Sequence, residues 1–113
     1  MLVRIWWGRI YPGSWPAIED AYRKLNEIPV PGMLGRLVTQ DVNDRESMYT
    51  ITLWDSLASV QAWETSSGFK DVFLASVGKF AAGSASISLC EVKAFDLAGL
   101  AALAAKGVGD VRR

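Results

Sequence analysis

Four short segments, rich in β-branched and aromatic residues or alternating in polarity, constrain the fold of this chain more than any other feature. A period of two is typical of a β-strand, in which neighbouring side chains point to opposite faces of a sheet. Proline, glycine and polar residues separate the segments and favour turns between them. We therefore predict strands over residues 2–11, 33–41, 47–54 and 84–94.

Two further segments place apolar residues at helical spacing. The first covers residues 15–27, and the second covers residues 57–80 with a break near Gly68. Ser56 directly precedes the second segment and is suited to cap a helix N-terminus. The resulting order, β-α-β-β-α-β, predicts an α+β ferredoxin-like fold with an antiparallel four-stranded sheet and both helices on one face.

The opposite face of that sheet also carries large apolar side chains. Trp6 and Trp7 are adjacent on the first predicted strand, so they point to opposite faces. Since the helices cover only one face, the other needs a cover of its own. A second copy related by a two-fold axis is the simplest cover, and we predict a homodimer.

Length and charge narrow the possible functions. With 113 residues the chain is expected to form one domain, residues 1–95, and an alanine-rich tail, residues 96–113, forming a short helix and then a disordered end. Twelve basic residues balance twelve acidic ones, which disfavours nucleic acid and anionic membranes as partners.

The sequence shows no signal peptide or membrane-spanning run, and its single cysteine, Cys90, needs no oxidising compartment. We expect a cytoplasmic protein.

Three short runs resemble the antibiotic biosynthesis monooxygenase (ABM) domains of the dimeric α/β-barrel superfamily. They are Gly32–Leu37, Tyr49–Ser56 with its Trp-Asp-Ser ending, and Ala62-Trp63. The resemblance covers roughly residues 1–93. It implies a homodimer whose two sheets close a barrel, with a small pocket between sheet and helices in each subunit.

The first chemistry that the resemblance implies is oxygenative haem degradation. Similar enzymes bind the iron through a histidine on the second long helix, with an asparagine on the first strand and a tryptophan nearby. Here only Trp63 matches, because Phe73 stands where the histidine is expected and Trp6 or Trp7 where the asparagine is. The chain contains no histidine. Haem degradation is therefore disfavoured, and we expect no cofactor.

The second implied chemistry is cofactor-free oxidation of a phenolic, polyketide-like substrate by molecular oxygen. It requires a dry apolar pocket and a group that stabilises the phenolate. Arg36, Arg4 and Tyr49 are the groups that could stabilise the phenolate, although the helix that carries Trp63 lacks the polar set of the quinone-forming members. The candidate pocket-lining residues are Trp6, Arg36, Tyr49, Trp54, Ser59, Trp63, Phe69 and Phe73.

A non-catalytic alternative stays open. Large aromatic residues also fill small cores, and an arginine such as Arg36 can simply extend its charge to solvent. The chain has no phosphate-binding loop, and without histidine it has no Ser-His-Asp or Cys-His set. The acidic hairpin turn around Asp44 lacks the pattern of a calcium loop, so we predict no metal site. The second hypothesis is a structural or small-ligand-binding homodimer of the same fold.

Overall fold

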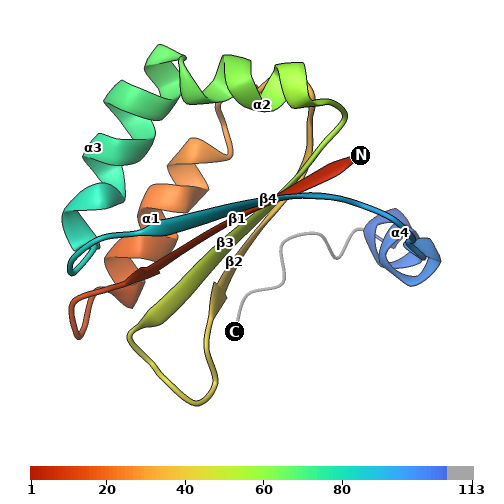
Figure 1. Ribbon diagram of the computed structural model, residues 1–113. Coiled ribbons are helices and arrows are strands. Elements are labelled where there is room, and N and C mark those ends of the chain that lie inside the picture. The colour runs from red at the N-terminus through yellow and green to blue at the C-terminus, as the bar shows by residue number, and fades with distance from the viewer. Residues whose placement is uncertain (107–113) are drawn as a thin grey trace.

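The computed structural model describes residues 1–106 and contains four strands and a split helical layer (Figure 1). The predicted β-α-β-β-α-β order is confirmed, and the short helix in the tail is present. The predicted disordered end lies outside the described residues, and the domain boundary near residue 95 stays a prediction. The elements are β1 (Leu2–Arg9), α1 (Trp15–Leu25), β2 (Met33–Gln40), β3 (Ser47–Trp54), α2 (Leu57–Glu64), η1 (Gly68–Phe73), α3 (Leu74–Ser76), η2 (Gly78–Phe80), β4 (Ser86–Glu91) and α4 (Ala98–Ala105).

The four strands form one antiparallel sheet in the order β2-β3-β1-β4. This is the ferredoxin-like arrangement that the sequence predicts. In Figure 1, α1, α2 and α3 lie over one face of the sheet, whereas α4 stands apart from that layer. None of the helices in residues 1–106 is long and apolar enough to cross a membrane.

The two adjacent tryptophans of β1 point to opposite faces, as predicted. Trp6 lies on the helix-covered face and is buried, while Trp7 lies on the open face and is half-buried. Trp7 Nε1 donates a hydrogen bond to Ser47 Oγ at 2.6 Å. The period of two therefore divides this strand between the core and a second surface.

Strand β2 departs from the predicted alternation at its start. Simple alternation places Met33 on the same face as Leu37, but the pairing shifts between Met33 and Gly35. This bulge adds one residue to β2, which turns Met33 toward the core and leaves Leu34 61% exposed. Bulges reverse the facing of every residue that precedes them, and local alternation cannot reveal them.

The second helical segment breaks near Gly68, as predicted. Helix α2 is capped by Ser56, whose Oγ accepts a hydrogen bond from the backbone N–H of Ser59 at 3.2 Å. The chain then resumes as the π-helical segment η1. A side chain at position 68 would place its Cβ 3.1 Å from the ring of Trp63, so glycine permits the close approach of η1 to α2.

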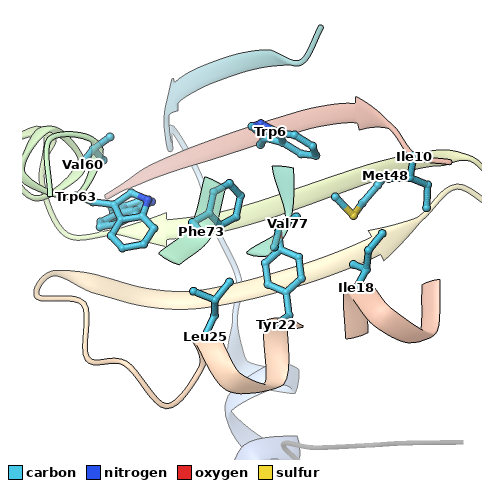
Figure 2. Close-up of a cluster of buried hydrophobic side chains, with 11 residues drawn as sticks. Trp6, Ile10, Ile18, Tyr22, Leu25, Met48, Val60, Trp63, Phe73 and Val77 are labelled. Atoms are coloured by element: carbon cyan, nitrogen blue, oxygen red, sulfur yellow. The ribbon is translucent and has the colours of Figure 1, made fainter. Parts of the chain in front are cut away.

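The core lies between the sheet and α1, α2, η1 and α3 (Figure 2). Tyr22 spans it from α1 and shares a hydrogen bond with Thr50 on β3 at 2.6 Å between the two oxygens. Burial raises the pKa of the Tyr22 hydroxyl to about 12. Trp54 is fully buried, and its Nε1 donates to Thr52 Oγ1 at 2.7 Å.

The open face of the sheet remains apolar and partly exposed within the described chain. The strand pairing places side chains from β1, β2 and β3 next to one another on this face. Helix α4 has no buried residue of its own. A patch of this kind on a small protein usually marks an interaction surface. We call it the open face; its large apolar members are Val3, Ile5, Trp7, Leu37, Tyr49, Ile51 and Leu53.

Candidate functional site

Five aromatic rings from β1, α1, α2 and η1 form one continuous cluster, four of which are labelled in Figure 2. Phe73 lies at its centre, stacked on Phe69 with ring centroids 5.5 Å apart. Trp6, Tyr22 and Trp63 each meet Phe73 edge-on at 6.0 to 6.4 Å. Edge-on and stacked pairs of this kind add to the stability gained from burial alone. We call these five residues the aromatic cluster.

The aromatic cluster occupies much of the space between sheet and helices. Trp6, Trp63 and Phe73 are each less than 10% exposed, and Phe69 is half-buried. Trp54 is also part of the core and has its indole N–H satisfied inside it. Three of the predicted pocket-lining side chains, Trp6, Trp54 and Phe73, thus fill the interior, while Trp63 and Phe69 extend to its edge.

A cleft of about 690 Å³ opens beside Trp63, between the α1–β2 connection and the α2–η1 turn. Its size is that of a small-molecule pocket, and its walls are mostly apolar. The indole of Trp63 joins the cleft to the aromatic cluster. The lining residues are Ile28, Pro29, Val30, Pro31, Ser59, Ala62, Trp63, Ser66, Ser67, Gly68, Asp71 and Val72.

Ser59 lines the cleft, but its hydroxyl is already engaged. Ser59 Oγ donates to Asp55 Oδ1 at 2.7 Å, and this bond lowers the pKa of the Asp55 carboxyl. Gly32 packs directly against the pair in a left-handed conformation, φ 83°. The hydroxyl of Ser59 therefore first stabilises the start of α2 and the wall of the cleft.

Arg36 and Tyr49 do not line this cleft. Arg36 lies on the helix-covered face of β2, where its Nη1 donates to Asn26 Oδ1 at 3.0 Å and its guanidinium lies 6.0 Å from the Tyr22 ring centroid. Partial burial lowers the pKa of Arg36. Tyr49 lies on the open face, paired with Trp7 across β1 and β3. The two residues are therefore on opposite sides of the sheet.

Arg4 is a buried charge beside the aromatic cluster. Its side chain is 5% exposed, and its Nε donates to Glu64 Oε2 at 3.2 Å. The guanidinium lies 5.5 Å from the centroid of the Phe69 ring. Nη2 is buried and has no hydrogen-bond partner within residues 1–106. Glu64 was not a sequence candidate, because 60 residues separate it from Arg4 and no local pattern links the two.

The donor set does not fit a haem iron. The chain has no histidine, and Phe73, at the position expected for the ligand, offers only a hydrocarbon ring. Cys90 on β4 pairs with Val3 on β1 and thus faces away from the aromatic cluster. Within the described part of the chain, histidine, cysteine and acidic residues form no group of three suited to a metal ion.

Comparison with solved structures shows the same fold in several proteins. A conserved protein from Methanosarcina mazei Go1 aligns with a TM-score of 0.70 at 17% identity, covering 82% of this chain and 94% of that one. A structure of an antibiotic biosynthesis monooxygenase aligns with a TM-score of 0.69 at 18% identity, covering 83% and 100%.

MhuD, crystallised as a variant with two manganese protoporphyrin IX molecules bound per active site, is similar too, with a TM-score of 0.71 at 23% identity over 85% of this chain and 98% of that one. No curated protein matches the sequence. The model of the antibiotic biosynthesis monooxygenase family matches residues 2–73, which is more than half of the chain. The chain therefore belongs to the antibiotic biosynthesis monooxygenase family.

Proposed function

We propose that the protein is a cofactor-independent monooxygenase that binds a small aromatic or polyketide-like molecule in the cleft beside Trp63. The cleft is the observation that carries this proposal. It has the volume of a small-molecule site, an apolar lining and the indole of Trp63 on one wall. A flat apolar molecule gains most from such a wall, because it can stack on the ring while leaving water.

The proposed reaction uses only the substrate and molecular oxygen. A tricyclic phenol with a C–H at the ring position opposite its hydroxyl loses the hydroxyl proton, and the resulting anion transfers electrons to O₂. The phenol oxygen becomes one carbonyl of the quinone, one atom of O₂ forms a new carbonyl on the opposite carbon, and the other atom leaves as water with the hydroxyl hydrogen and the C–H hydrogen. The protein then needs to exclude water and to stabilise an anion rather than to supply electrons.

A non-catalytic ligand-binding role is the second candidate. It is favoured by the packing of Trp6 and Phe73, which occupy the space between sheet and helices. The hydroxyl of Ser59 is likewise committed to Asp55. In this alternative the cleft holds its ligand without oxidising it.

Oxygen consumption distinguishes the two candidates. The assay follows dissolved O₂ and quinone absorbance with a tricyclic phenol of the type described above, alongside a binding measurement with the same compound. The variant Ala62→Phe fills the cleft from an exposed position on α2, and Gln61→Phe is its matched control on the same helix. Oxygen uptake abolished only by Ala62→Phe supports the monooxygenase. Binding without uptake supports the second candidate, and no binding refutes both.

We also propose that the protein is a homodimer built on the open face. The side chains Val3, Ile5 and Ile51 lie next to one another there, on paired strands, and remain partly exposed. A second copy would remove them from water in a self-complementary contact. We further propose a cytoplasmic location, which the single cysteine supports because it forms no intrachain disulfide.

A further inference from the structure

We propose that Arg4 and Glu64 form a subsite that recognises the hydroxyl group of a phenol. The inference rests on the proposed function, because it names the group by which the aromatic ligand is recognised. Neither residue lines the cleft, but the Phe69 ring beside Arg4 packs edge-on against Trp63, which does. The starting point is the buried Nη2 of Arg4, which has no partner in residues 1–106.

An unpaired buried donor is costly. A buried N–H of a charged group that makes no hydrogen bond loses its hydration without compensation. Arg4 cannot relieve this cost by losing its proton, since a guanidinium stays charged in proteins. Its Nε donates to Glu64, whereas Nη2 is buried without a partner in residues 1–106 and is therefore a donor free to bind an oxygen atom.

Glu64 supplies the complementary acceptor. Its Oε2 accepts from Arg4, and its Oε1 accepts no hydrogen bond from a side chain or backbone group within residues 1–106. The bond from Arg4 Nε to Glu64 Oε2 holds the guanidinium and the carboxylate in contact, and such a donor–acceptor pair matches a hydroxyl group, whose oxygen accepts and whose hydrogen is donated. A carboxylate ligand fits less well, because Glu64 would repel it.

The surroundings of the pair select an aromatic hydroxyl. Phe69 lies under the guanidinium at 5.5 Å and stacks on Phe73, so a flat surface of rings borders the polar pair. Leu89 on β4 is the pairing partner of Arg4 on the same face of the sheet. Leu89 is 43% exposed and Glu64 is partly exposed, so the polar pair lies near the surface on the β4 side.

The subsite also suits the proposed chemistry. When the phenol is deprotonated, its proton passes to Glu64 Oε1 and the phenolate oxygen keeps the hydrogen bond from Arg4 Nη2. The O–H bond of the phenol breaks, an O–H bond on the carboxylate forms, and total charge is conserved. Because the guanidinium is buried, its interaction with a developing negative charge is weakly screened by water.

Binding of 2-naphthol and naphthalene to the full chain tests the inference, since the two differ only in the hydroxyl group. Calorimetry should show 2-naphthol bound at least about tenfold more tightly, the usual effect of a hydrogen bond to a charged group. Arg4→Met should remove most of that advantage and leave naphthalene binding unchanged. Arg9→Met is the matched control, because Arg9 is an exposed arginine on the same strand that pairs with Asp44.

Ala62→Phe separates the subsite from the cleft. If Ala62→Phe weakens binding of both ligands alike and Arg4→Met removes only the hydroxyl advantage, the subsite is supported. If Ala62→Phe abolishes binding of both ligands and Arg4→Met has no effect, the cleft is the binding site and the subsite is refuted. If neither ligand binds the unmodified protein, the proposed function fails and the subsite with it.

A crystal structure of the unmodified protein with 2-naphthol covers the case in which Arg4→Met does not fold. The ligand oxygen should lie within hydrogen-bond distance of both Arg4 Nη2 and Glu64 Oε1. A structure in which an ordered water accepts the hydrogen bond from Arg4 Nη2 while the ligand lies elsewhere would overturn the assignment. Circular dichroism of each variant establishes whether its binding data describe a folded protein.

Discussion

Replacement of Gly32 by alanine should destabilise the protein more than any ordinary glycine replacement in a loop. Gly32 has φ 83°, a conformation that costs an alanine roughly 1–2 kcal/mol. A Cβ at this position would also come 2.7 Å from Asp55 Oδ1 and still closer to Ser59 Oγ. The Ser59–Asp55 hydrogen bond must then give way, which costs about 1 kcal/mol more. The expected total loss in free energy of unfolding is about 2–3 kcal/mol.

Gly13→Ala is the control that isolates the backbone cost. Gly13 has φ 79°, and no atom lies within 4 Å of the position its Cβ would take. Urea unfolding at one fixed protein concentration, followed by circular dichroism, gives the free energy for both variants. We expect Gly32→Ala to lose about 1 kcal/mol more than Gly13→Ala. Equal losses would show that Ser59 and Asp55 do not pack against Gly32, and the described cleft wall would then be wrong.

Two further predictions concern Tyr22 and the open face. Because burial raises the pKa of Tyr22 from 10.0 to about 12, the unfolded chain ionises first, so stability is full below pH 10 and falls by roughly 2–3 kcal/mol between pH 10 and about 12. Urea unfolding across this range should show the fall, and Tyr22→Phe should lack this component; an unchanged slope in the variant would contradict the assignment. Ile51→Lys places a charge on the open face and should convert a dimer to a monomer in light scattering, whereas Gln61→Lys on α2 should not. A dimer that persists in Ile51→Lys would exclude the open face as its interface.

Local residue patterns predicted most of the fold because the periodicity of a strand or a helix can be recognised within a few residues. The alternation of Tyr49, Ile51 and Leu53 with Thr50 and its neighbours predicted the two faces of β3 correctly. The glycine at position 68 likewise marked the break between α2 and η1. The bulge after Met33 escaped prediction, since an inserted residue changes the pairing without changing the local composition.

The candidate site, like the fold, could be predicted only in part from the sequence. The sequence alone determined that no histidine can act as a ligand, acid or base, that the protein is rich in aromatic residues and that both sheet faces are apolar. Only the tertiary structure decided that Trp6 and Phe73 fill the interior, that the cleft opens beside Trp63, and that Arg4 meets Glu64 across 60 residues. Composition and periodicity are properties of neighbours in the chain, whereas cavities and ion pairs arise where distant segments pack together, and their geometry depends on every side chain between them.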